Sequence, residues 1–166
     1  MPNAHRDSLD KQVPRDPHTG TTRGTSLKHQ TRVPKEAPAE MNLILLSGEY
    51  AKLHAGAMMA AVAASFDMPV NVFVSMEALP AFHRDPAIRA TVRKGEVGRK
   101  LEESGGDDYL ALLNQAKDFG DVTIYACSLV ADLYGWTLED LAPIFDDVMG
   151  VAGFLGKTAT GTTIAL

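Results

Sequence analysis

The sequence predicts a three-layer α/β/α domain in which helices cover both faces of a mostly parallel sheet of about five strands. Two observations support this fold class. Short apolar runs that end in glycine, serine or proline alternate with longer segments of helical period, which is the strand–helix order of a parallel sheet. Hydrophobic residues make up 45% of the 166 residues and charged residues 22%, so the chain can build one sizeable core.

The first strand, helix and second strand follow each other directly. Residues 42–46 form an apolar run that ends at Ser47-Gly48, as a buried parallel strand does. Residues 49–67 show helical period, and their many alanines and glycines allow a close approach to the sheet or to a sister subunit. The apolar stripe of this helix consists of Ala51, Ala55, Met58, Met59, Val62 and Phe66. Pro69 follows the helix, and residues 70–75 are rich in β-branched side chains, which favour a strand.

The middle of the chain predicts mostly helix. Residues 77–82 fit a helical turn, and the charged segment 88–103 fits a surface helix that ends at the glycines after Ser104. A further helix is expected from Asp107 to Phe119, with Gly120 as its C-cap.

The last third repeats the strand–helix order. The β-branched run 122–126 predicts a buried strand, and the segment from Cys127 to Tyr134 predicts the next helix. Thr137 and Asp140 form an approximate capping box for a helix over 138–145. A very short strand at 146–149, a helix at 150–158 and a closing strand at 161–166 complete the pattern.

Residues 1–40 differ in composition from residues 41–166 and predict a disordered extension. They hold five of the nine prolines and no aromatic residue, so they have little apolar surface to bury. Their histidines, His5, His18 and His29, are too irregularly spaced to indicate a metal site.

Charge and cysteine content narrow the function classes. Residues 1–40 hold seven Lys/Arg and five Asp/Glu, whereas residues 41–166 hold nine Lys/Arg and 16 Asp/Glu. An acidic domain argues against a nucleic-acid partner. No stretch approaches the roughly 20 apolar residues of a membrane span, and the start lacks a signal peptide. With one cysteine and no Cys/His cluster, we expect a cytoplasmic protein without a metal or cofactor.

Cys127 is the candidate catalytic residue. It stands where the strand 122–126 meets the next helix, and helix amides at such a junction favour a thiolate. Parallel sheets place their chemistry at this carboxyl edge. The alternative is a small buried core residue, the commonest fate of a free cysteine.

Other polar residues are expected near Cys127. Ser47, Gly48 and Ser75 end their strands at the same sheet edge, and their hydroxyls and amides could bind a substrate or simply form turns. Ser128 could donate to the thiolate or cap the helix. Lys52 could offer positive charge to an anionic donor, although a solvated lysine is the commoner role.

These segments together resemble the DsrE/DsrF-like family of sulfur-relay proteins over residues 41–166. The matching features are Ser47, Gly48, Glu49 and Lys52 after the first strand, the Ala-rich helix, Val74-Ser75, the Ile-Tyr-Ala-Cys-Ser run at 124–128 and the segment 150–155 before a closing strand. Residues 84–106 depart from the family pattern. The resemblance implies a homo-oligomer (trimer or hexamer) that carries sulfane sulfur as a persulfide on the cysteine, here Cys127. It also implies partners that donate or accept this sulfur, such as rhodanese-like proteins or small sulfur carriers.

We therefore expect a sulfur carrier of the sulfurtransferase type, in sulfur oxidation or sulfur trafficking. Whether such a carrier counts as an enzyme stays open, because it returns to its starting state only with two partners. The alternative is a non-catalytic structural or small-molecule-binding subunit of a sulfur-relay complex. A single cysteine disfavours a dithiol oxidoreductase, and the lack of a GxGxxG loop after the first strand disfavours a nucleotide site.

Overall fold

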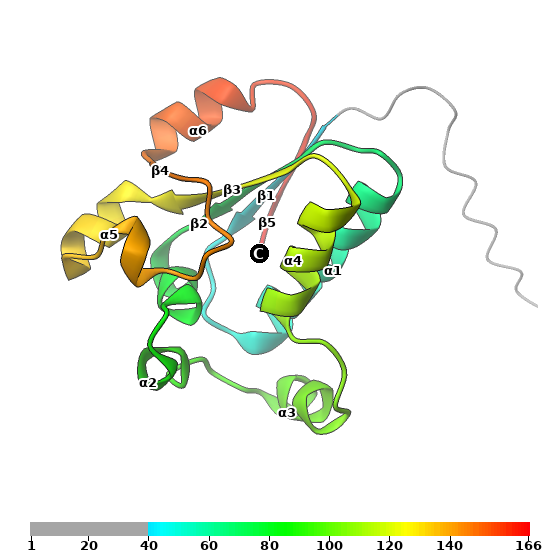
Figure 1. Ribbon diagram of the computed structural model, residues 1–166, viewed down its shortest axis with the longest axis vertical. Coiled ribbons are helices and arrows are strands. Elements are labelled where there is room, and N and C mark those ends of the chain that lie inside the picture. Colours follow the sequence, from blue (N-terminus) through cyan, green and yellow to red (C-terminus); the bar gives the residue numbers. More distant parts are fainter. Residues whose placement is uncertain (1–39) are drawn as a thin grey trace, which may run out of the picture. The chain divides into compact units, whose positions relative to one another are not determined.

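The structure is a computed structural model that describes residues 40–166 (Figure 1). The predictions made for residues 1–39, which are the disordered extension and its three histidines, lie outside the described residues. In these residues, the buried side chains of the three inner strands of the sheet belong to one hydrophobic core.

Five parallel strands form one sheet, which confirms the predicted fold class. The strands are β1 (Met41–Leu45), β2 (Val70–Val74), β3 (Val122–Cys127), β4 (Asp147–Met149) and β5 (Thr162–Ala165). Their order is β4-β3-β2-β1-β5, and every neighbouring pair is parallel. All residues of the central strand β2 are buried, as expected for a strand that is covered on both faces.

Helices connect these strands. The α-helices are α1 (Tyr50–Ser65), α2 (Pro86–Arg89), α3 (Glu96–Glu103), α4 (Tyr109–Phe119), α5 (Ser128–Tyr134) and α6 (Val151–Lys157), and the 3-10 helices are η1 (Met76–Phe82) and η2 (Leu138–Asp140). Figure 1 shows α1 and α4 on one side of the sheet and α6 on the other. On the α6 side, the ring of Phe154 stacks on Phe73 of β2 with centroids 4.9 Å apart.

Small residues, and not the large apolar stripe, form the inner face of α1. Gly56 packs so closely on the sheet that a Cβ there would lie 2.6 Å from the side chain of Leu45. The stripe residues Met58, Val62 and Phe66 point outward and are 49%, 52% and 53% exposed. The alanines and glycine therefore allow a close approach to the sheet, as predicted, and leave the larger side chains on the outside.

Two predicted helices were wrong in extent. Residues 88–103 form parts of two short helices, because the main chain of Arg93 pairs with Gly48 and Tyr50 (N···O 3.0 and 2.9 Å) and so interrupts the segment. The predicted helix over 138–145 is only the single turn η2. Its predicted capping box is present, but the Ala142 amide donates to the Phe82 carbonyl and Pro143 has no amide to continue the helix.

Gly120 ends α4 as predicted, but for a different reason. It is the C-cap residue in an extended conformation, with φ of −169°, and not in the left-handed conformation typical of such glycines. A Cβ at Gly120 would lie 2.9 Å from the carbonyl oxygen of Ala64 at the end of α1. Glycine is needed here for the close contact between the two helices.

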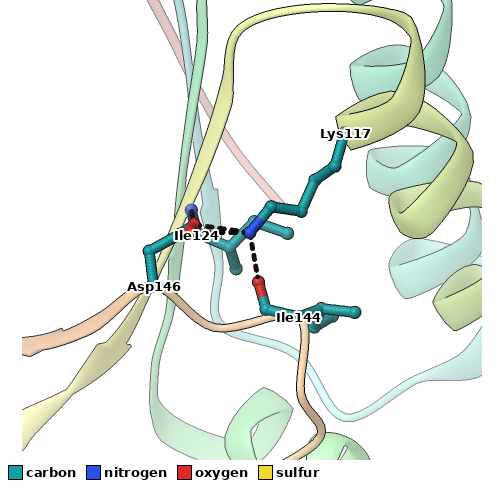
Figure 2. Close-up of polar contacts among 4 residues, drawn as sticks. All are labelled: Lys117, Ile124, Ile144 and Asp146. Atoms are coloured by element: carbon teal, nitrogen blue, oxygen red, sulfur yellow. Dashed lines mark hydrogen bonds and ion pairs between the residues drawn. The ribbon is translucent and has the colours of Figure 1, made fainter.

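One ion pair joins α4 to the edge of the sheet (Figure 2). The Lys117 ammonium donates to both carboxylate oxygens of Asp146 at 2.7 Å and to the Ile144 carbonyl at 2.8 Å. Asp146 in turn accepts a hydrogen bond from the Ile124 amide of β3 at 2.8 Å. These contacts hold the segment before β4 against β3, the strand that carries Cys127.

Candidate functional site

Cys127 lies at the carboxyl edge of the sheet, as predicted. It is the last residue of β3 and pairs with Met149 of β4. Because Val74 pairs with Ala126, Ser75 follows in register beside Cys127 on the other side. The cysteine thus stands between β4 and β2 on the edge where parallel α/β sheets usually bind ligands.

The local surroundings of the thiol differ from the prediction. Cys127 belongs to β3 and is the N-cap of α5, so it is not the first residue of that helix. Its side chain makes no capping hydrogen bond, so the helix amides do not hold the sulfur. The residue is only 3% exposed. Sulfur chemistry at Cys127 therefore requires a local opening of the residues that cover it.

The two serines beside Cys127 occupy different environments. Ser75 is 2% exposed, and its main chain is fully used: the amide donates to Leu45 and the carbonyl accepts from Ala78. Ser128 is half-buried and faces Gly150, where a Cβ would lie 3.6 Å from its hydroxyl. Gly150 is the N-cap of α6, so Ser128 sits between the starts of α5 and α6.

The remaining predicted residues form a separate group at the end of β1. The Ser47 hydroxyl accepts a hydrogen bond from the Glu49 amide at 3.3 Å, which is ordinary turn chemistry. Ser47 and the exposed Lys52 line a shallow hollow of about 320 Å³ with Glu77. Cys127 is not part of its lining, so the structure divides the predicted residues between two places on one edge.

A second cleft of about 280 Å³ adjoins this hollow and contains residues that the sequence did not reveal. Gly48, Glu77, Arg93 and Tyr134 belong to its lining. Arg93 and Glu77 form an ion pair at 2.7 Å, and both side chains are largely exposed. Glu77 comes three residues after the end of β2, and this position could have marked it as a candidate site residue from the sequence. Arg93 lies in the segment 84–106, which contains no recognisable motif.

Close backbone packing shapes this cleft. A Cβ at Gly48 would clash with the Glu77 carbonyl oxygen, so only glycine fits there without movement. Between Ser75 and Glu77, Met76 has φ of +48°, a left-handed conformation that costs a non-glycine residue roughly 1 kcal/mol or more. Such strain often marks functional sites, and here it turns the chain so that Glu77 lies over Gly48.

Within residues 40–166, no group of three or more His, Cys, Asp or Glu side chains is placed to hold a metal ion. None of the helices in these residues combines the length and the apolar character needed to span a bilayer.

Comparisons with known proteins leave the family open. No family model matches the sequence, and no curated protein matches it. The fold is similar to a solved structure of a protein of unknown function from Methanobacterium thermoautotrophicum, at 15% sequence identity and a TM-score of 0.42. That similarity covers 76% of this chain and 99% of the other. It carries no information on function.

Proposed function

We propose that this protein is a cytoplasmic sulfur carrier that accepts sulfane sulfur as a persulfide on Cys127 and passes it to a protein partner. The supporting observation is the position of Cys127. The only cysteine of the sequence ends β3, an inner strand of a parallel sheet, at the carboxyl edge, where this fold class places its chemistry. The resemblance of its motifs to the DsrE/DsrF-like family supports the same chemistry.

The reaction needs only two exchanges at sulfur. The Cys127 thiolate attacks the outer sulfur of a donor R–S–SH, which gives Cys127–S–SH and the thiolate R–S⁻. An acceptor thiolate R′–S⁻ then attacks the outer sulfur of Cys127–S–SH, which gives R′–S–SH and restores the Cys127 thiolate. Sulfur moves without net oxidation. Because the sequence has no second cysteine, the acceptor thiol must come from another molecule.

The burial of Cys127 adds one requirement to this proposal. The thiol must become accessible when a donor binds, because it is 3% exposed in this structure. The helix that follows it, α5, is seven residues long, buries only Val130 and Ala131 and carries the exposed Leu133. Short helices with few buried contacts open at low free-energy cost. We propose that a donor or acceptor protein displaces α5.

Intact mass spectrometry tests the carrier function. The reduced protein is exposed briefly to thiosulfate, to sodium polysulfide or to a persulfidated carrier protein, beside a Cys127→Ser variant as the matched control. We expect a mass increase of whole sulfur atoms on the native protein, absent from the variant and reversed by a thiol reductant. If the protein gains no sulfur while its thiol is shown to be intact, the carrier proposal fails.

A second candidate is a small-molecule-binding subunit that uses the cleft of Gly48, Glu77, Arg93 and Tyr134. The buried thiol and the exposed Arg93–Glu77 pair favour it. Arginine recognises carboxylate or phosphate groups, so a small anionic ligand that replaces Glu77 as the partner of Arg93 fits this cleft. A Cys127→Ser variant would keep this binding and an Arg93→Ala variant would lose it, whereas sulfur loading depends on Cys127.

A further inference from the structure

We propose that the outer edge of β5 pairs with β5 of a second copy of this chain, so that two sheets join across a two-fold axis. This inference is independent of the sulfur chemistry. The side of β5 that faces β1 is occupied by main-chain hydrogen bonds to β1 and its flanking residues. The Thr162 and Leu166 amides donate to Glu40 and Ile44, and the Leu166 carbonyl accepts from Leu46.

This register leaves the alternate residues of β5 facing outward. Because the residues 162, 164 and 166 point their main-chain groups toward β1, those of Thr163 and Ala165 point away from the sheet. Thr163 and Ala165 are exposed, and within residues 40–166 no strand pairs with this side of β5. Free amides and carbonyls in a row form a template for another strand.

The charges of the two sheet edges differ and favour β5 as the contact. The opposite edge strand, β4, starts with the exposed Asp147, and an acidic side chain discourages pairing between identical edges. Residues 158–166 contain no charged side chain. In a chain of net charge −5, this segment allows two copies to approach without repulsion between like charges at the contact.

The neighbouring side of α1 supplies apolar surface next to this edge. Tyr50 and His54 mark the side of α1 that contacts α4, through the ring of Tyr109 and the carbonyl of Asp107. By helical spacing, the opposite side of α1 carries Ala55, Met59, Val62 and Phe66, which we call the α1 flank.

The α1 flank lies toward β5. A Cβ at Gly56 would lie 2.6 Å from Leu45 of β1 and 3.2 Å from Leu166, which follows β5, so α1 covers this end of the sheet, and α4 packs on its other side. No Asp, Glu, Lys or Arg occurs from residue 53 to residue 66. A long helix surface without charge is unusual where it faces only water, and it commonly marks an interface.

A second copy fits these features better than an unrelated protein, because the edge is complementary to itself. In an antiparallel pair centred on Ile164, Thr163 of one copy lies opposite Ala165 of the other, and the reverse pair repeats this contact. Four main-chain hydrogen bonds form, Ile164 meets its own symmetry mate, and the two α1 flanks come together on one face. The assembly then contains an even number of copies.

The first test uses sedimentation of the full chain and an Ala165→Pro variant over a range of concentrations. Proline removes an outward amide and no bond to β1, and edge strands tolerate it at such a position. Ala165→Val, which keeps the amide, is the matched control. We expect dimers or larger even-numbered assemblies for the native protein and for Ala165→Val, and a dissociation constant at least about tenfold higher for Ala165→Pro.

A second variant and a second measurement keep the test decisive. Val62→Glu places like charges in the two α1 flanks and is expected to weaken association by a similar factor, with circular dichroism unchanged. Hydrogen exchange should show that the Thr163 and Ala165 amides are protected at high concentration and exposed on dilution. A monomeric native protein, an assembly that both variants leave intact, or concentration-independent protection of these amides by another segment of the chain would each overturn the proposal.

Discussion

At the scale of single residues, the account depends on a thiol that is well placed but covered. Cys127 ends β3 beside Ser75 and Met149, yet only 3% of it is exposed. A buried cysteine is protected from unspecific oxidation until its cover opens. The same burial is what an inert core cysteine would show, so reactivity, and not position, distinguishes the two roles.

Tyr109 connects the helix layer to the candidate cleft. Its hydroxyl donates to the Ala81 carbonyl at 2.6 Å, and its ring meets Tyr50 and Phe82 edge-on. Burial, and secondarily the nearby Asp108 carboxylate, raises the pKa of Tyr109 above its usual value. Ala81 belongs to the lining of the cleft, so this hydrogen bond helps fix its wall.

The raised pKa of Tyr109 predicts a loss of stability at alkaline pH. The stabilisation that comes from the protonated Tyr109 hydroxyl is complete below the unfolded-state pKa of about 10. It is lost progressively as the pH rises from there toward the folded-state pKa, because the unfolded state releases the proton first. We expect Tyr109→Phe to lower the free energy of unfolding by about 1–3 kcal/mol at pH 7, and to lose less further stability than the native protein above pH 10. Urea unfolding from pH 7 to pH 11 measures this, and parallel curves would contradict it.

At the scale of elements, a polar contact fixes the sheet edge next to Cys127. The Lys117–Asp146 pair ties α4 to the segment before β4, while Asp146 also accepts the Ile124 amide (Figure 2). The lysine side chain is 26% and the aspartate side chain 40% exposed, so the pair is only partly screened by water. The pair connects α4, β3 and the segment before β4, whereas an ordinary surface ion pair joins only two side chains.

Removal of this lysine should therefore cost more than removal of a surface lysine. We expect Lys117→Met to lower the free energy of unfolding by about 1–3 kcal/mol, since it leaves the Ile144 carbonyl without the lysine donor and the Asp146 carboxylate without its counter-ion. The matched control is Lys100→Met, which breaks an exposed helix pair with Glu96 and should cost less than about 0.5 kcal/mol. Equal effects of both changes in urea unfolding would show that the pair has no special role.

The sequence predicts elements well where local signals decide and poorly where distant contacts do. The five strands and the helices α1, α4 and α6 follow from apolar runs, helical period and glycine or proline stops. The interruption of the predicted helix 88–103 could not be predicted, because it results from main-chain pairing of Arg93 with Gly48 and Tyr50, far away in the sequence.

The candidate site shows the same division. Placement of Cys127, Ser47 and Ser75 at one sheet edge follows from strand ends alone and is confirmed. Burial of the thiol and its separation from the hollow at Ser47 depend on packing across the sheet, which periodicity does not report. The Arg93 side of the cleft belongs to a segment without a recognisable motif.

At the scale of the whole molecule, the two edges of the sheet have different tasks in this account. β4, which starts with the exposed Asp147, lies next to Cys127 and is left to a sulfur donor or acceptor in our proposals. The β5 edge, at the far end of the strand order and without charged side chains, is the proposed contact between two copies. Such an assembly keeps the two cysteines apart, so that each copy can meet its own partner protein.

The most direct test of the central claim is a complete transfer. The protein is loaded with ³⁴S-labelled sulfane sulfur, freed of excess donor and mixed with glutathione, beside the Cys127→Ser variant treated in the same way. The account predicts that the label leaves the native protein, appears as glutathione persulfide in a ratio of up to one sulfur per chain, and that the recovered protein loads again. Label that never enters the native protein, or that enters the Cys127→Ser variant equally, would contradict it.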